Sequence, residues 1–159
     1  TPTLPANYTA QRRLGSMRTN VTGQWSGFTQ DGDYFTWTTP VQDVNANNPG
    51  TSAVTRTLSV PTGTTVFANV QGVLQNIGAT LNNFLYLSDL AQTDLVPAAT
   101  VTDVALTIFA AGGAEYSGGR FSIRTNASGQ IRSRIAASDV NQTLILNTQG
   151  WIDRRGRDA

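Results

Sequence analysis

The chain has 159 residues, a formal net charge of +1, and charged side chains at only 13% of its positions. It contains no cysteine and no histidine, and each of its 11 basic residues is an arginine. These absences exclude a disulfide framework, a thiolate nucleophile, the commonest general base and a phosphate-loop lysine. The near-neutral charge gives no general attraction to nucleic acid or to an anionic membrane, and no apolar run approaches the length of a membrane-spanning helix.

Short runs rich in Thr, Val, Phe and Ile alternate with turn signals along the chain, which is typical of an all-β protein. We expect about ten strands, near residues 9–18, 24–30, 34–44, 53–60, 64–75, 80–88, 101–110, 119–126, 130–137 and 142–149. Because no helical crossover segments separate these runs, the sequence predicts an antiparallel β-sandwich that resembles a jelly roll.

The length fits one domain with a single core. We expect a linker-like segment over residues 1–8, the sandwich over 9–150, and a tail over 151–159 that packs on the domain or on a neighbouring subunit. Because the first residues read like a linker, we also expect a longer protein to precede them.

Residues 70–85 fit two structures. Their apolar residues recur at helical spacing, but Gly72 and Gly78 are unfavourable inside a helix. We therefore predict two strands joined by a turn over 76–79, with a helix as the alternative.

The DGD stretch at 31–33 joins two predicted strands. A glycine at the centre of such a connection is typical of a tight hairpin turn, which is the role that we assign. The carboxylates could instead form half of a calcium site or a glycoside-hydrolase pair. A glycan depolymerase that uses Asp31, Asp33 or Glu115 is the least favoured hypothesis, because neither pairing nor placement supports it.

Five aromatic residues fall between positions 24 and 39. Period-two alternation places Phe35 and Trp37 on one face of a strand with Asp33, and Tyr34 on the other face. We expect Phe35 and Trp37 in the core, and Trp25 and Tyr34 at the surface. Exposed rings beside Asp, Asn and Gln can form a platform on which a pyranose stacks. Trp25, Tyr34 and Asp33 are therefore the candidate carbohydrate-binding residues.

The stretch RFSIRTNASGQIRSRI at 120–135 is typical of a hairpin. Pairing Ile123 with Ser133 leaves a three-residue loop, 127–129, whose last residue is the glycine that a left-handed backbone requires. In this register the arginines form a row on the outer face, made of Arg120, Arg124, Arg132 and Arg134.

Like charges this close need an opposing anion. One explanation is that carboxylates cover the arginine row, either from a neighbouring subunit or from within the chain, where the candidates are Asp103, Asp139, Asp153 and Asp158. The other is a site at which forked guanidinium donors bind a carboxylate or phosphate of a ligand.

Four stretches resemble a known domain: LPANYTAQRRLGSM at 4–17, GFTQDGDYFTW at 27–37, TPVQDVNANNPGTSAVTRTLSVPTG at 39–63, and GWIDRRGRDA at 150–159. That domain is found at the end of tail-fibre and other virion structural proteins of bacteriophages and of prophages of proteobacteria. The resemblance does not extend to residues 67–118. It implies a β-rich, trimeric appendage module that attaches to other virion proteins or touches the host surface, and it supplies no catalytic residues.

In a homotrimer, acidic residues of a neighbouring chain would pair with the arginine row and with Arg12 and Arg13. The mixed charges at the chain end also suit a subunit contact or a contact with another virion protein. The residues that we assign to that contact are Arg12, Arg13, Trp151, Arg154 and Arg155.

The leading hypothesis is therefore a fibre or spike domain, located in the virion, that assembles as a homotrimer and helps to bind host cell-surface polysaccharide. The alternative is a purely architectural head-decoration or collar protein without a host ligand. We expect no enzymatic activity, no cofactor and no metal.

Overall fold

The computed structural model describes residues 4–7, 15–19, 22–78, 81–100, 104–109 and 113–154, and these form nine strands and no helix. The strands are β1 (Phe28–Asp31), β2 (Tyr34–Asn47), β3 (Val54–Thr57), β4 (Phe67–Ile77), β5 (Asn83–Ser88), β6 (Leu106–Ile108), β7 (Ala114–Arg124), β8 (Gln130–Ile135) and β9 (Gln142–Ile152).

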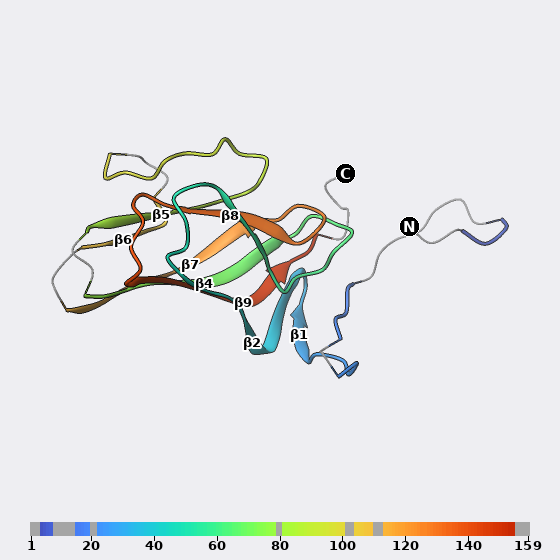
Figure 1. Ribbon diagram of the computed structural model, residues 1–159. Coiled ribbons are helices and arrows are strands. Elements are labelled where there is room, and N and C mark those ends of the chain that lie inside the picture. The colour runs from blue at the N-terminus through green and yellow to red at the C-terminus, as the bar shows by residue number, and fades with distance from the viewer. Residues whose placement is uncertain are drawn as a thin grey trace.

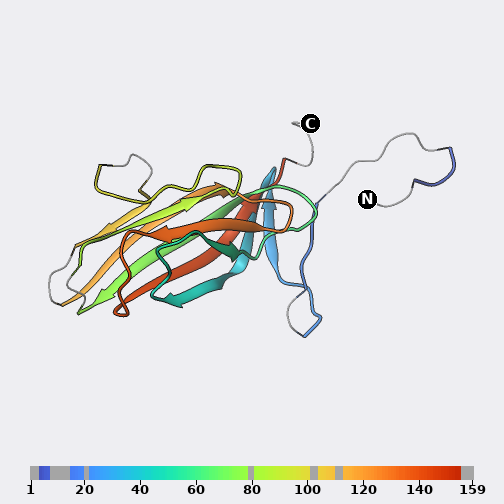
Figure 2. The same ribbon diagram turned by 45° about the horizontal axis from the view of Figure 1, so that its top comes forward.

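Two antiparallel sheets face each other (Figures 1 and 2). The five-stranded sheet has the order β1-β2-β9-β4-β7, and the four-stranded sheet has the order β3-β8-β5-β6. The all-β sandwich predicted from the sequence is confirmed. Jelly-roll connectivity is not established by this order and stays a prediction.

Each predicted run from 24–30 onward overlaps an observed strand. The run over 9–18 does not: residues 15–18 form no strand, and 9–14 lie outside the described residues. At the other end β9 continues to Ile152, so the first residues of the expected tail belong to the sandwich.

Residues 70–77 and 83–85 lie in strands, and the helical alternative is wrong. β4 and β5 flank a connection that begins at Gly78, whose φ of +77° takes the chain out of the strand. Gly72 has a packing role inside β4, because a Cβ there would lie 3.0 Å from the Phe121 ring. The glycines that weaken a helix are thus explained by a turn and by a neighbouring side chain.

An aromatic cluster fills one end of the core. Phe35 and Trp37 are buried, as predicted, and Trp151 stacks on Phe35 with the ring centroids 4.9 Å apart. Phe28 packs against all three of these rings. The assignment of Trp151 to a subunit contact is corrected: its side chain has no exposed surface and belongs to the core of its own chain.

The hairpin predicted over 120–135 is wrong. β7 lies in the five-stranded sheet, where it pairs with β4 along its whole length, and β8 lies in the other sheet between β3 and β5. The turn chemistry was nevertheless correct, since Gly129 has a φ of +71° and the Asn126 side chain accepts hydrogen bonds from the amides of Ser128 and Gln130. The turn fixes the local backbone, whereas pairing with β4 along the whole of β7 decides which strand β7 joins.

β2 contains a bulge at Asp43. Its inward residues are odd-numbered as far as Val41 and even-numbered from Val44, and the register with β9 shifts between Gln42 and Val44. One extra residue reverses the faces of a strand, so the bulge returns the apolar side chains of β2 to the core.

Candidate functional site

Five residues form a row across the outer face of the five-stranded sheet. Asp31, Tyr34, Ile152, Phe67 and Arg124 pair in succession from β1 to β7, and we call them the aromatic row. Tyr34 is 56% exposed and Phe67 is 43% exposed. Two accessible rings therefore flank Ile152, with opposite charges at the ends of the row.

Polar side chains follow further along the same face. Two rows, which we call the amide rows, consist of Gln42, Asn147, Gln71 and Arg120, and of Asn47, Thr143, Gln75 and Tyr116. The Nε of Arg120 donates to Oε1 of Gln71 at 3.3 Å, and Tyr116 is 64% exposed. From Phe67 to Gln75 along β4 the face spans about 26 Å at the usual rise of a strand. Amides thus lie between exposed aromatic rings at the two ends.

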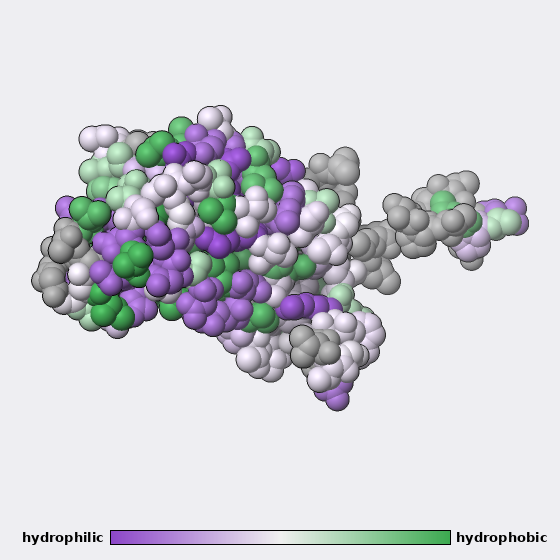
Figure 3. Space-filling view, viewed as in Figure 1, coloured by the Kyte–Doolittle hydropathy of each residue, from purple (hydrophilic) through white to green (hydrophobic). Residues whose placement is uncertain are grey.

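This combination has the chemistry of a carbohydrate surface. Aromatic rings stack on apolar C–H faces, and each amide offers donors and an acceptor to hydroxyl groups. On the side of the molecule that Figure 3 shows, hydrophobic residues are interspersed with hydrophilic ones. That side therefore has no extended apolar patch of the kind expected for an obligate apolar interface.

The predicted sugar-binding residues are separated by the fold. Tyr34 belongs to the aromatic row, whereas Trp25, 70% exposed, precedes β1 and lies at the opposite end of the β1–β2 hairpin. Asp33 is half-buried in the turn, and its carbonyl oxygen accepts the Asp153 amide at 2.9 Å. The structure therefore places only Tyr34 on the face that it shares with Asp31.

The hairpin turn predicted at DGD is confirmed, with Gly32 at a φ of +58°. The carboxylates proposed for a depolymerase are dispersed. Asp31 lies on β1 and Glu115 on β7, the two opposite edge strands of the sheet, whereas glycosidase carboxylates lie within about 10 Å of each other.

Three of the four arginines of the predicted row contact one loop, residues 89–94. We call these three, Arg124, Arg132 and Arg134, the arginine clamp. Arg124 pairs with Asp89 at 2.9 Å, and Arg134 pairs with Asp94 at 2.6 Å. The guanidinium of Arg132 donates to the carbonyl oxygens of Gln92 at 2.7 Å and of Leu90 at 3.2 Å.

The acidic partners that the described residues show are thus Asp89 and Asp94, neither of which was among the candidates named from the sequence. Asp139 accepts the amide of Asn141, Asp153 is buried after β9, and Asp103 and Asp158 lie outside the described residues. Of the cations assigned to a subunit contact, Arg154 is exposed, and Arg12, Arg13 and Arg155 also lie outside the described residues.

A further arginine, Arg56, points inward from the edge strand β3. It pairs across from the buried Ile131, and its guanidinium donates to Ser133 Oγ at 2.9 Å and to the Pro49 carbonyl at 2.8 Å. Burial lowers the pKa of Arg56 from its usual value. An inward charge on an edge strand disfavours pairing with the strands of other proteins.

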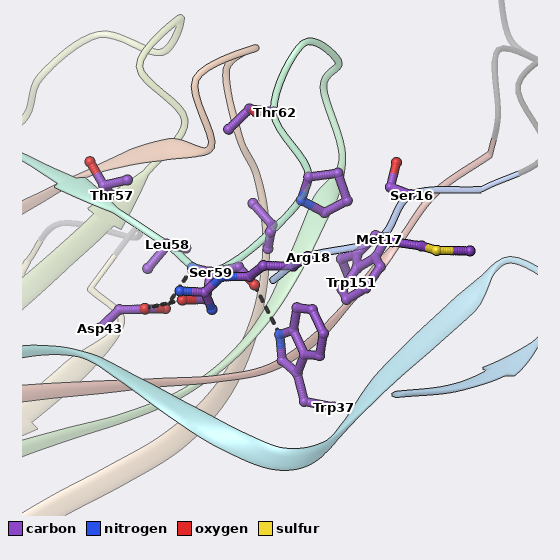
Figure 4. A pocket seen from close by; sticks show the side chains of 12 residues that line it. Ser16, Met17, Arg18, Trp37, Asp43, Thr57, Leu58, Ser59, Thr62 and Trp151 are labelled. Carbon is purple, nitrogen blue, oxygen red and sulfur yellow. Dashed lines mark hydrogen bonds between the residues drawn. The ribbon is translucent and has the colours of Figure 1, made fainter. Parts of the chain in front are cut away.

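A pocket of about 350 Å³, the rim pocket, opens between the sheets (Figure 4). It is lined by residues 16–18 and 57–62 together with Trp37, Asp43 and Trp151. Sequence reasoning missed it, because these positions are far apart in the chain. The available signal was the change of alternation phase between Trp37 and Val44, which marks the bulge at Asp43.

A hydrogen-bond network shapes this pocket. Asp43 accepts the backbone amide of Ser59 at 2.8 Å, the Ser59 hydroxyl at 2.5 Å and the Thr148 hydroxyl at 2.5 Å. The Trp37 indole donates to the Ser59 carbonyl at 2.9 Å. These bonds tie the segment 57–62 to β2 and β9, and so fix the pocket walls.

Among the described residues, no group of three or more His, Cys, Asp or Glu side chains could hold a metal ion. No helix within the described residues has the length and apolar character needed to cross a bilayer. No protein-family model matches the chain, and none of the curated proteins compared with it matches either.

Proposed function

We propose that the chain is a non-enzymatic fibre or spike domain of a bacteriophage virion that assembles as a homo-oligomer and binds host cell-surface polysaccharide. The observation that supports binding is the outer face of the five-stranded sheet, where the aromatic row adjoins the amide rows. The virion location rests on the resemblance of the sequence to tail-fibre domains.

The shape of the face favours an extended glycan. Tyr34 and Phe67 at one end and Tyr116 at the other are separated by about 26 Å of amide-bearing sheet, which is long compared with a single sugar ring. Amides bind hydroxyl groups without selecting a charge, and of the two arginines on the face Arg124 is paired with Asp89 and Arg120 donates to Gln71, so an uncharged polysaccharide suits the face.

The architectural alternative uses the same face differently. Ile77 is exposed, and Val73 pairs across from Ile145 in the middle of the face, so a neighbouring subunit could cover these apolar side chains. In that case the face would be an interface between copies and would bind no glycan.

Glycan-array screening followed by calorimetry tests the proposal. Tyr34→Ala and Phe67→Ala should each weaken polysaccharide binding by up to about tenfold, since each removes a ring contact worth about 0.5–1.5 kcal/mol. Trp25→Ala is the matched control, because it removes an even more exposed ring that lies outside the face.

Binding by the intact chain that survives both face variants, or that is lost in Trp25→Ala alone, contradicts the proposed face. If no glycan binds, and Phe67→Ala lowers the oligomeric mass measured by light scattering, the architectural alternative is correct. A monomeric intact chain would contradict assembly in either form.

A further inference from the structure

β7 has the one long strand edge that no other strand covers in the part of the chain that the structure describes. It spans 11 residues at the margin of the five-stranded sheet, beside β4 (Figure 1). The other edge strands, β1, β3 and β6, have four residues or fewer, and β3 also carries the inward Arg56. Short strands and inward charges protect a sheet edge against pairing. β7 contains no proline, and its ladder with β4 has no bulge, so its edge lacks such protection.

The backbone groups of the even-numbered residues of β7 point to this edge. The amide of Thr125 donates to the Val66 carbonyl at 2.8 Å, and the Gly113 carbonyl accepts from Gly78 at 3.1 Å. Hydrogen-bonded pairs alternate along an antiparallel ladder, so the odd-numbered residues of β7 bond β4 and the even-numbered residues do not. The amides and carbonyls of the even-numbered residues form no hydrogen bond with any described residue, and these residues are all exposed.

A groove lies beside the same edge. It has a volume of about 440 Å³ and separates residues 120–123 of β7 from Tyr86, Leu87, Gln92, Val104 and Ala105. The odd-numbered side chains of β7, such as Phe121, face the other sheet, and a strand added to β7 would aim its own alternate side chains the same way. The edge thus offers a new strand both hydrogen-bonding groups and room on its inner side.

The charges of β7 match a second copy of the same strand. Glu115 lies near the start of β7, whereas Arg120 and Arg124 lie in its second half. Antiparallel pairing about a two-fold axis is self-complementary, so it brings the acidic end of one strand beside the basic end of the other. Opposite charges across a strand pair stabilise it, and like charges destabilise it.

We propose that two copies of the chain form a two-fold dimer in which their β7 edges pair antiparallel, with Gly118 opposite Gly118 on the axis. In this register Tyr116 lies opposite Arg120 of the second copy, and the guanidinium can pack on the exposed ring. Glu115 lies opposite Phe121 of the second copy, on the inner side, where it faces the groove that Arg120 also lines.

Other registers fit less well. An axis at Arg120 would place two arginines directly opposite each other. Residues beyond 122 adjoin the loop 89–94, which Arg124 holds through Asp89. With the axis at Gly118 the pairing stays within residues 114–122, and their even-numbered members exchange about ten hydrogen bonds.

The dimer joins two five-stranded sheets into one continuous sheet, so the outer faces of both copies form a single surface. This consequence rests on the proposed function, because a doubled glycan-binding face gains avidity for a long polysaccharide. The contact is two-fold, so the trimer expected from the sequence needs a separate interface.

Light scattering tests the contact. The intact chain should show twice its mass of 17.0 kDa, and Gly118→Pro should weaken the association about a hundredfold, because each copy loses an amide donor at the axis. That amide points away from β4, and edge strands tolerate proline at such positions, so the fold should persist. Gly118→Ala keeps the amide and should remain dimeric. Glu115→Gln removes a charge at constant size and should weaken the association up to about fivefold.

Amide hydrogen exchange reports the register residue by residue. In the dimer the amides of Tyr116, Arg120 and Ser122 should exchange at least about tenfold more slowly than in the Gly118→Pro monomer. The odd-numbered amides of β7 bond β4 in both chains, so their unchanged rates show that β7 itself is intact.

The outcomes distinguish this inference from the proposed function. A monomeric intact chain overturns both the dimer and the proposed assembly, whereas the glycan array tests the binding face independently. An oligomer that persists in folded Gly118→Pro keeps the assembly and overturns the β7 contact. If Gly118→Pro does not fold, unchanged association of Glu115→Gln together with rapid exchange of the even-numbered amides in the oligomeric intact chain overturns the contact, and slow exchange of those amides supports it.

Discussion

Gly150→Ala tests a close approach of two backbones in the sandwich. β9 and β2 come together beside Gly150, and a Cβ added there would lie 2.0 Å from the Phe35 carbonyl oxygen and 2.9 Å from the Cα of Thr36. The φ of Gly150 is not in the left-handed region, so the conflict is one of space. The obstacles are backbone atoms, which cannot rotate away as a flexible side chain can.

The geometry sets the size of the effect. Non-bonded heavy atoms pack best at about 3.5–4.0 Å, so β2 and β9 would have to separate by more than about 1 Å at this pair. That shift also disturbs the stack between Phe35 and Trp151. Overpacking costs typically about 1–3 kcal/mol, and we expect Gly150→Ala to lower the free energy of unfolding by about 3 kcal/mol. The midpoint of thermal unfolding should fall by about 6–12 °C.

Urea unfolding, followed by tryptophan fluorescence, measures this difference. Gly118→Ala is the control: it lies in β7 of the same sheet, its new Cβ would be 3.5 Å from the nearest atom, and it should stabilise the chain by about 0.5 kcal/mol. If Gly150→Ala unfolds within about 0.5 kcal/mol of the parent chain, the spacing of β2 and β9 described above is wrong.

Three further changes have defined outcomes. Asn83→Ala should lower the free energy of unfolding by about 3 kcal/mol in urea, because the buried amide bonds the backbone at Phe84, Ala136 and Ala137; a loss below about 1 kcal/mol would contradict this. Asp43→Ala should cost about 2–3 kcal/mol in the same assay, since it leaves two hydroxyls and an amide without their acceptor, and Asp43→Asn should recover part of that loss. Arg134→Met should raise the amide hydrogen-exchange rates of residues 89–94 at least about tenfold without changing those of β4, because the clamp fixes the loop locally; equal exchange in both chains would contradict that role.

The alternation of side chains was the most informative feature of the sequence. It placed Phe35 and Trp37 in the core and Tyr34 at the surface, and it kept Arg132 and Arg134 off the buried face of β8. These assignments depend only on the period of a strand, which is the same whichever strand lies alongside.

Alternation does not tell which strands pair with each other. The turn at Asn126 to Gly129 has the chemistry of a hairpin, yet the backbone amide of Thr125 bonds Val66 and continues the β4–β7 pairing, while Gly129 accepts the amide of Leu58 from another segment. A short turn restricts a few dihedral angles, whereas β7 gains a full ladder of hydrogen bonds by following β4.

The candidate site, too, was only partly predictable from the sequence. Exposure of Tyr34 followed from alternation, but the aromatic row needs the registers of four strand pairs, and only the β1–β2 hairpin is local in the sequence. The rim pocket combines Arg18, Asp43 and Trp151, and only tertiary packing brings these together. Trp151 in particular looked like part of a charged tail, because its burial depends on Phe35 and Trp37, more than a hundred residues earlier in the chain.

The arginine clamp has a mechanical consequence. Arg124 belongs to the five-stranded sheet, and Arg132 and Arg134 belong to the four-stranded sheet, yet all three hold residues 89–94. The loop is therefore a brace between the layers, and sliding one sheet past the other requires breaking ionic contacts at both of its ends. In an appendage under tension, force that enters one sheet would pass to the other through these six residues as well as through the apolar core.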